Sequence, residues 1–311
     1  MQTFPQKQQF EKIIQAISPQ SKLLRVWQLH GGVSAEMTAL TFEDLGGEMR
    51  KMIVRQHGNQ PEQHSTALEN EYRLLQTINS LGLATPVPYY LDQSRTILAT
   101  PYMVIEYIEG GMLFSPVDLD DYMVQFATQL AKIHSIECSH GDLSFLSENV
   151  DICAEVGELD DLWVDEVGVQ EALEFVSFLR QKNKTTLLHG DFWPGNSLWR
   201  EGKLVAVIDW EDAEVGDPLI DLARSRSEIV WIFGIEAMNS FTACYQSMMS
   251  IDYTNLPYWD LCAALRLLRI TKDDLSELTA YISLFGRDDI GEEAIRANLT
   301  YFIEQAFEKL V

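Results

Sequence analysis

The stretch from His189 to Ala223 constrains the fold of this chain more than any other, and it reads HGDFWPGNSLW, a short bridge, and AVIDWEDAEVGDPLIDLA. Asp191 and Asn196 are separated by four residues on a segment that contains Pro194 and Gly195. Both polar side chains therefore belong to a tight loop and not to a helix. A loop of this kind can direct both side chains to one point.

A short apolar run follows this loop. Residues 204–208 read LVAVI, which predicts a buried strand, and Asp209 stands at its end. The turn signal Glu201-Gly202 joins loop and strand, so we expect a hairpin with Asn196 and Asp209 facing each other across its mouth. Such an oxygen pair suits a hard cation, and Mg²⁺ in particular is usually held by one or two carboxylates together with substrate phosphates.

The spacing Asp-x-x-x-x-Asn is also that of the kinase catalytic loop, in which the Asp accepts the proton of the attacking hydroxyl and the Asn holds a metal ion. Here the loop begins His-Gly-Asp, and residues 209–211 read DWE where protein kinases have Asp-Phe-Gly. Residues 216–223 then read GDPLIDLA. With these three motifs in this order, the chain resembles the aminoglycoside phosphotransferase and choline kinase superfamily.

A second His-Gly-Asp triplet, at residues 140–142, shows how little the triplet means alone. Five residues beyond Asp142 the chain has Ser147 instead of Asn, and no apolar strand ending in Asp follows. We interpret this copy as a loop. The combination of motifs, and not the triplet, indicates the site.

The resemblance implies an α+β, two-lobed, protein-kinase-like fold. A small antiparallel-sheet lobe over residues 1–108 would bind the nucleotide, and a larger, mainly helical lobe over residues 109–311 would carry the catalytic loop and the substrate cleft. The implied reaction is the ATP-dependent transfer of the γ-phosphoryl group to a hydroxyl of a small molecule. Asp191 would be the catalytic base, and Asn196 and Asp209 would hold Mg²⁺.

The first hundred residues have the pattern of a sheet with two helices. The turn at residues 30–34 (HGGVS) contains two glycines and Ser34, and the backbone N–H groups of such a turn can contact the phosphates of a nucleotide. An ordinary hairpin without a ligand is the alternative. The expected elements are a helix from Phe10 to Ile17, strands from Leu23 to Leu29, Met37 to Phe42 and Met49 to Arg55, and a helix from Ser65 to Leu81.

Arg55 and Glu71 form a predicted ion pair. Arg55 stands where the third strand of kinases has a phosphate-binding Lys, and this substitution keeps the charge but alters the geometry. Helical periodicity puts Glu71 among the inward residues of its helix, where a carboxylate needs a cation. The pair would mirror the Lys–Glu pair of kinases. The alternative is that Glu71 extends to the surface.

Residues 102–108 (YMVIEYI) predict another apolar strand, which ends before Gly110-Gly111. By the resemblance, this segment joins the two lobes, and backbone groups from Glu106 to Ile108 would hydrogen-bond adenine. Any strand at the edge of a sheet has the same pattern, so the boundary near residue 109 depends on the resemblance.

The rest of the chain has helical periodicity. Gly216-Asp217-Pro218 predicts a helix start, with Asp217 as its cap and Asp221 reaching back to brace the catalytic loop, as acidic residues do in related folds. His134 at a helix end fits a cap or core role better than chemistry. The expected helices run from Asp120 to His134, Glu171 to Leu179, Trp231 to Met248, Tyr258 to Ile270, Asp274 to Phe285 and Glu292 to Leu310.

Composition excludes some partners. The chain has 311 residues and a net charge of −24, which disfavours a nucleic acid or an anionic membrane as partner. It shows no signal-peptide pattern and no apolar run of membrane-spanning length, so we expect a cytoplasmic protein. The four cysteines lack metal-site spacing, and we expect reduced thiols without zinc.

The acceptor is the open question. From Glu137 to Glu174 the chain has twelve Asp and Glu residues and no Lys or Arg, which favours a cationic acceptor such as an amino alcohol or an aminoglycoside. A solvated acidic surface is the alternative. Neutral sugars and homoserine also fit the superfamily. A nucleotide-binding or regulatory module without turnover is the rival interpretation, and the short bridge after Asp209 disfavours a protein kinase.

Overall fold

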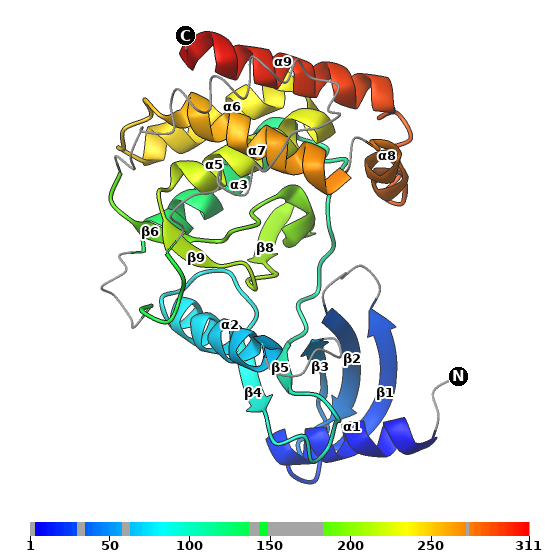
Figure 1. Cartoon of the computed structure of the whole chain (residues 1–311). Helices are drawn as coiled ribbons and strands as arrows, with labels where there is room; N and C mark the ends of the chain where they lie inside the picture. Colours follow the sequence, from blue (N-terminus) through cyan, green and yellow to red (C-terminus); the bar gives the residue numbers. More distant parts are fainter. Residues whose placement is uncertain are drawn as a thin grey trace. The chain divides into compact units, whose positions relative to one another are not determined.

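The computed structural model describes residues 4–29, 35–57, 63–136, 143–148, 183–271 and 274–310. The chain divides into two compact units, Met1–Glu109 and Gly110–Val311 (Figure 1). Several sequence predictions lie outside the described residues: the Gly-Gly turn with Ser34, the control residue Asp142, the helix from Glu171 to Leu179, and most of the acidic segment from Glu137 to Glu174.

The first unit contains a five-stranded antiparallel sheet in the order β1-β2-β3-β5-β4. Strand β4 was not predicted, because Pro86-Val87-Pro88 indicated a loop. Pro88 begins this strand at the edge of the sheet, where a residue without an N–H does not interrupt a ladder of hydrogen bonds. The strands are β1 (Lys22–Leu29), β2 (Ala35–Glu43), β3 (Met49–His57), β4 (Pro88–Asp92) and β5 (Tyr102–Glu106).

The two faces of this sheet have different partners. Helix α1 (Phe4–Ile17) buries Phe10, Ile13 and Ile14 in one hydrophobic cluster with Met52 and Val54 of β3. Arg55 is the next residue along β3, so its side chain lies on the opposite face. Helix α2 (Gln63–Ser80) carries the buried Glu71 and begins two residues earlier than predicted.

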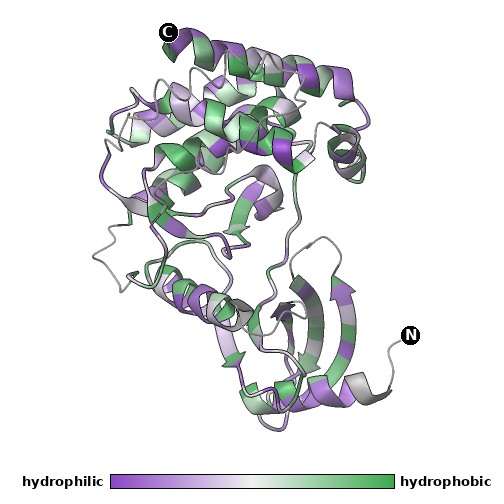
Figure 2. Ribbon diagram, viewed as in Figure 1, coloured by the Kyte–Doolittle hydropathy of each residue, from purple (hydrophilic) through white to green (hydrophobic). Residues whose placement is uncertain are grey.

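The second unit is mainly helical. Figure 1 shows α9 packing on α7 and α5, which agrees with the contacts between these elements, and α6 packs on α3 and α5. In Figure 2 its helices carry hydrophilic and hydrophobic residues in alternating bands, as expected for helices that bury one face. The helices are α3 (Leu119–His134), α5 (Leu219–Phe233), α6 (Ile235–Met248), α7 (Leu256–Thr271), α8 (Ser276–Ser283) and α9 (Glu292–Leu310).

The prediction of one helix from Trp231 to Met248 is wrong at its start. Gly234 has φ 88°, a left-handed conformation that glycine adopts without steric cost, and it separates α5 from α6. Helical periodicity continues through this break, because the apolar residues on both sides are core residues. The periodicity therefore gave no sign of it.

Two short antiparallel pairs of strands lie in this unit. Strands β7 (Ser197–Arg200) and β8 (Lys203–Val207) form the predicted hairpin. Its turn has φ 52° at Glu201 and φ 73° at Gly202, the positive values that a tight two-residue hairpin turn requires. The pair β6 (Thr186–Leu188) and β9 (Glu214–Gly216) was not predicted, because three-residue strands carry too little pattern.

Two cysteines fall in the described part of the chain. Cys244 is a free thiol, whereas the buried Cys262 of α7 is disulfide-bonded. The expectation of reduced thiols throughout is therefore wrong at Cys262. Among the described helices, none combines the length and the apolar character needed to cross a membrane.

A buried ion pair connects the helices of the second unit. Arg226 of α5 donates to both carboxylate oxygens of Asp260 in α7, with Nε–Oδ1 2.9 Å and Nη2–Oδ2 3.0 Å. Its Nη1 donates to the hydroxyl of Thr242 in α6, and its guanidinium lies 5.6 Å from the ring centroid of Phe302 in α9. One side chain therefore contacts three other helices.

We expect Asp260→Ala to lower the free energy of unfolding by about 3–5 kcal/mol, because it leaves the buried charge of Arg226 without its partner. The matched control is Asp289→Ala. Asp289 accepts the same two-pronged contact from Arg287, at 2.8 and 2.9 Å, but is 66% exposed, so its loss should cost less than about 1 kcal/mol. Urea unfolding measures both. Equal losses would contradict a burial-dependent role.

Candidate active site

The predicted loop brings Asp191 and Asn196 into direct contact. The loop follows β6 and passes through the short helix η1 (Pro194–Asn196) into β7. The amide Nδ2 of Asn196 donates to the backbone oxygen of Asp191 and to its carboxylate Oδ2, both at 2.9 Å. Asn196 is buried and the Asp191 side chain is 33% exposed, so the pair lies at the surface of the unit with only its acid accessible.

Asp209 lies at the open end of the β7–β8 hairpin, on the side of Asn196. The backbone N–H of Ile208 donates to the Asn196 carbonyl at 2.9 Å, which extends the hairpin ladder by one step. Asp209 follows directly, with φ 66°. This left-handed conformation is one that Asp and Asn adopt more readily than other non-glycine residues, and it turns the chain sharply at the strand end.

His189 has a fixed tautomer. Its Nε2 lies 3.0 Å from the carbonyl of Ile208, a group that only accepts, so Nε2 carries the proton. Nδ1 accepts from the backbone N–H of Asp191 at 3.2 Å. A neutral imidazole thus bridges the loop and the strand end, and both ring nitrogens are used for positioning instead of proton transfer.

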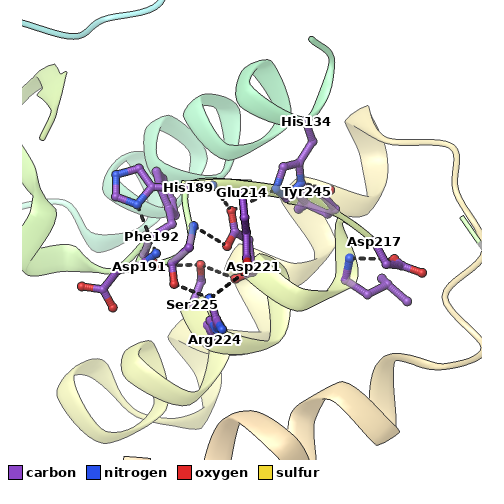
Figure 3. Close-up of polar contacts among 12 residues, drawn as sticks. His134, His189, Asp191, Phe192, Glu214, Asp217, Asp221, Arg224, Ser225 and Tyr245 are labelled. Carbon is purple, nitrogen blue, oxygen red and sulfur yellow. Dashed lines mark hydrogen bonds and ion pairs between the residues drawn. The ribbon is translucent and has the colours of Figure 1, made fainter. Parts of the chain in front are cut away.

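Asp221 is the centre of the hydrogen bonds that hold the loop (Figure 3). Its fully buried carboxylate accepts from the backbone N–H of His189 at 2.6 Å and from that of Gly190 at 3.0 Å. His134 of α3 approaches Oδ2 at 3.4 Å with Nε2, while its Nδ1 contacts the hydroxyl of Tyr245 at 2.6 Å. The predictions that Asp221 braces the loop and that His134 is structural are confirmed.

Two further residues of α5 hold the same loop and were missed from the sequence. Arg224 donates to the carbonyl of Gly190 and lies 3.7 Å from Glu214 of β9, and Ser225 Oγ donates to the carbonyl of Phe192 at 2.7 Å. With Asp221 they occupy positions i, i+3 and i+4, which share one helix face. That spacing was a signal available in the sequence.

Asp217 has the predicted capping role. Its Oδ1 accepts from the backbone N–H of Leu219, the first residue of α5, at 3.0 Å. Because this contact fixes the start of α5, it also fixes the place of Asp221 one turn later.

Glycine is required at Gly190. Its φ is +83°, and a Cβ atom there would come within 1.9 Å of the backbone oxygen of Asp212. The absent side chain lets the loop pass against the segment that follows Asp209.

The neighbours of Asp191 shift its pKa in opposite directions. Burial raises the pKa of Asp191 above its ordinary value, while Arg266 of α7 lowers it and the charges of Asp212 and Asp209 raise it further. The Nη2 of Arg266 lies 3.7 Å from Asp191 Oδ1, whereas Asn196 occupies Oδ2. Arg266 was not predicted, because nothing in the sequence links α7 to the loop.

Glu228 is a second perturbed carboxyl near the loop. Its pKa is raised to about 7: burial and the charge of Asp191 raise it, while the hydrogen bond from Trp231 and the charge of Arg266 oppose the rise. Trp231 Nε1 donates to Glu228 Oε2 at 2.8 Å. Near neutral pH this group is therefore only partly ionised.

In the first unit, the predicted pair of Arg55 and Glu71 is confirmed. Arg55 Nε lies 3.4 Å from Glu71 Oε2, and both side chains are almost fully buried. The backbone N–H of Glu106 donates to the carbonyl of Val87 at 2.8 Å, and β5 ends at Glu106. The predicted strand is thus two residues too long, and Ile108 lies beyond its end.

Together the units define a class of protein. A five-stranded antiparallel sheet with a buried Arg–Glu pair between strand and helix, followed by a mainly helical unit with an Asp–Asn loop, is the α+β architecture of protein-kinase-like proteins. Residues 25–246 match the model of the phosphotransferase enzyme family, and the chain belongs to this family.

Similar proteins agree with this fold. The macrolide 2′-phosphotransferase type I structure has a TM-score of 0.64 and 18% identity, over 97% of this chain and 98% of that chain. A thermostable mutant of aminoglycoside phosphotransferase APH(4)-Ia, in a ternary complex with AMP-PNP and hygromycin B, has a TM-score of 0.60 and 18% identity, over 96% and 98% of the two chains.

A curated relative is much longer than this chain. Acyl-CoA dehydrogenase family member 10 of Mus musculus is 24% identical over 178 residues, which are 51% of this chain but 16% of that protein. The likeness is therefore to one part of the mouse protein.

Gly190→Ala should cost several kcal/mol more than Gly202→Ala. Both glycines have positive φ, +83° and +73°, so both substitutions carry a backbone cost of about 1–2 kcal/mol. At Gly202 nothing lies within 4 Å of an added Cβ, whereas at Gly190 the backbone of Asp212 must move. Denaturant unfolding of the two variants isolates the clash. Equal stability would mean that the loop shifts freely.

Asp221→Asn should lower stability in a pH-dependent way. Burial opposes ionisation, yet the hydrogen bond from His134 and the charge of Arg224 hold the pKa of Asp221 below its ordinary value. A carboxyl with a lowered pKa in the folded state stabilises above its unfolded pKa of about 3.9, and this contribution is lost as the pH falls through the folded value.

We therefore expect a difference of about 3 kcal/mol between wild type and Asp221→Asn at pH 7, which shrinks below about pH 4. Urea unfolding at a series of pH values measures it. A difference that stayed constant down to pH 2 would show that the carboxylate charge contributes nothing.

Proposed function

We propose that this protein is an ATP-dependent phosphotransferase that moves the γ-phosphoryl group to a hydroxyl of a small molecule. The observation that carries the proposal is the Asn196 contact with Asp191 at 2.9 Å, in a loop that the Asp209 hairpin adjoins. Membership of the phosphotransferase family supports it.

Asp191 acts as the catalytic base in this proposal. Asn196 orients its Oδ2, Arg266 lies 3.7 Å from its Oδ1, and the exposed part of the carboxylate would accept the proton of the acceptor hydroxyl. Burial and the neighbouring carboxylates raise its pKa, and this makes it a better proton acceptor than an exposed carboxylate. Kinase catalysis depends chiefly on such positioning and on electrostatic stabilisation.

Asn196 and Asp209 are the proposed Mg²⁺ ligands. Because Asn196 Nδ2 donates to Asp191, its Oδ1 is the atom directed to a cation. An amide oxygen and a carboxylate form an all-oxygen donor set, the kind that Mg²⁺ prefers. When bound, Mg²⁺ supplies charge neutralisation on the transferring phosphoryl group.

The nucleotide is assigned to the first unit. Arg55, oriented by Glu71, would meet the phosphates, and Ser34 would contribute a phosphate contact from its turn. The backbone oxygen of Glu106 and the backbone of Ile108 would bind adenine, since the Glu106 N–H already donates to Val87. The AMP-PNP complex of a protein with the same fold supports a nucleoside triphosphate as donor.

An amine-bearing acceptor is the finer part of the proposal. It is favoured by the acidic segment from Glu137 to Glu174, and by the hygromycin B complex of the APH(4)-Ia mutant. Arg266 restricts where the ammonium group of such an acceptor can bind, because its positive charge lies 3.7 Å from Asp191 Oδ1. The ammonium group of such an acceptor would lie away from Arg266. A neutral metabolite is the alternative acceptor.

A kinase-fold module that binds nucleotide without turnover is the rival function. Such a module need not keep both the proposed base and its amide partner in hydrogen-bonding geometry, whereas this chain does. The rival predicts nucleotide binding without release of ADP in the presence of any alcohol.

We expect Asp191→Asn to reduce phosphoryl transfer by about 10²- to 10⁴-fold while Mg-ATP binding changes little, because the lost group acts on the acceptor. The control is Asp142→Asn in the second His-Gly-Asp triplet, which should keep the wild-type rate. A coupled ADP-release assay with a panel of hydroxyl acceptors, and calorimetry with Mg-ATP, provide the readouts. Wild-type turnover by Asp191→Asn would overturn the proposed site.

Arg55→Ala and Glu71→Ala should be non-additive in Mg-ATP binding. Glu71 acts through Arg55, so the second substitution should add little once the first is made, with a coupling energy of about 0.5–3 kcal/mol. Calorimetric Kd values for the two single variants and the double variant complete the cycle. Strict additivity would remove Glu71 as the residue that orients Arg55.

A further inference from the structure

An aromatic cluster adjoins the catalytic loop in the second unit. It consists of Phe114, Trp193, Tyr281 and Phe285, and Trp193 stands between Asp191 and Asn196 on the loop itself. Its ring centroid is 5.8 Å from that of Tyr281 in α8 and 6.2 Å from that of Phe114. Phe285 completes the cluster, 4.8 Å from Phe114 and 5.3 Å from Tyr281.

Contacts with Gly195 hold the Trp193 ring in place. It packs flat on Gly195, where an added Cβ would come within 2.2 Å of the ring. The segment that carries Phe114 is fixed in turn, because Arg287 donates to the Phe114 carbonyl at 2.7 Å. The indole therefore has one orientation relative to the loop.

The cluster is only partly covered. Phe114 is 2% exposed, but Trp193, Tyr281 and Phe285 keep part of their surface open to solvent. The Tyr281 hydroxyl is directed at the sulfur of Met112, at 3.5 Å. Aromatic surface left open beside a reactive group is available to a ligand.

We propose that Trp193 and Tyr281 form an apolar wall of the acceptor site, so that the acceptor presents a flat apolar or aromatic face next to its reacting hydroxyl. The inference rests on the proposed function, since it takes Asp191 as the base. An acceptor hydroxyl must come within about 3 Å of Asp191. Trp193 is two residues further along the loop, at most roughly 7 Å of chain, so the same molecule reaches the indole.

Charged groups also lie close to Asp191. Arg266 approaches Oδ1, and Glu228 with its partner Trp231 lies near both charges. The acceptor therefore meets charged groups as well as an apolar surface. This arrangement selects an amphipathic alcohol over a uniformly polar one, because only the former covers the aromatic surface.

The test compares matched alcohols that differ only in an apolar group. The pairs are methyl and phenyl β-D-glucoside, and 2-aminoethanol and 2-amino-1-phenylethanol. The variants are Tyr281→Ala, Tyr281→Phe and Trp193→Phe, with Tyr301→Ala on α9 as a control that removes an exposed tyrosine away from the cluster. Phosphoryl transfer gives kcat and KM for each alcohol, and saturation-transfer NMR gives binding without turnover.

We expect the wild type to prefer the phenyl-bearing member of at least one pair, in KM and in saturation of the phenyl protons. Tyr281→Ala should reduce this preference about tenfold, which corresponds to about 1.4 kcal/mol of apolar contact. Tyr281→Phe, Trp193→Phe and Tyr301→Ala should keep most of it. KM for Mg-ATP should not change in Tyr281→Ala, Tyr281→Phe or Tyr301→Ala.

Three results would overturn the wall. One is a wild type without preference in either pair, and another is an unchanged preference in Tyr281→Ala. The third is an equal loss for both members of a pair, accompanied by a lower unfolding midpoint, which would mean that the cluster only anchors α8 to the loop. If no alcohol is phosphorylated while Mg-ATP binds, the proposed kinase function is wrong. The NMR comparison still tests whether Trp193 and Tyr281 bind the apolar group of an alcohol.

Discussion

The loop that carries Asp191 and Asn196 depends on one buried carboxylate. Asp221 accepts hydrogen bonds from two successive backbone N–H groups of the loop, and no water is needed to satisfy either donor. A buried charge is costly unless it is paired and hydrogen-bonded, so the arrangement is stable only when the loop has its observed conformation. The positive φ of Gly190 and the protonated Nε2 of His189 belong to that conformation. The geometry of Asp191 and Asn196 follows from these contacts and not from contacts of their own side chains with the core.

The charges around Asp191 complement this scaffold. Burial and the nearby Asp209 and Asp212 favour the protonated acid, whereas Arg266 favours the carboxylate. Arg266 approaches Oδ1 of Asp191, whereas Asn196 donates a hydrogen bond to Oδ2. In the proposed mechanism, a partly exposed carboxylate with one oxygen held by a hydrogen bond suits proton transfer from an approaching hydroxyl, and the proposed aromatic wall at Trp193 would border the same approach.

Sequence reasoning succeeded where a local pattern or the family resemblance placed a residue. The β7–β8 hairpin follows from a turn signal and an apolar run. The brace by Asp221 and the pair of Arg55 with Glu71 were expected from the resemblance, with helical periodicity turning Glu71 inward. It failed where tertiary contacts decide. Gly234 ends α5 inside a continuous apolar pattern, Cys262 forms a disulfide despite its isolated spacing, and Arg266 reaches the loop from a helix far along the chain. None of these three features can be recognised from the sequence within a window of ten residues.

Helix α5 explains how these parts fit together. Its first turns hold the loop through Asp221, Arg224 and Ser225, and its cap at Asp217 sets their register. The next residue, Arg226, binds Asp260 and so fixes α7, the helix that brings Arg266 to Asp191. One helix therefore positions the loop directly and the opposing cation indirectly. The two tasks use different residues of α5, so a substitution at Asp221 should disturb the loop directly, whereas one at Arg226 should reach Asp191, the proposed base, only through α7 and Arg266.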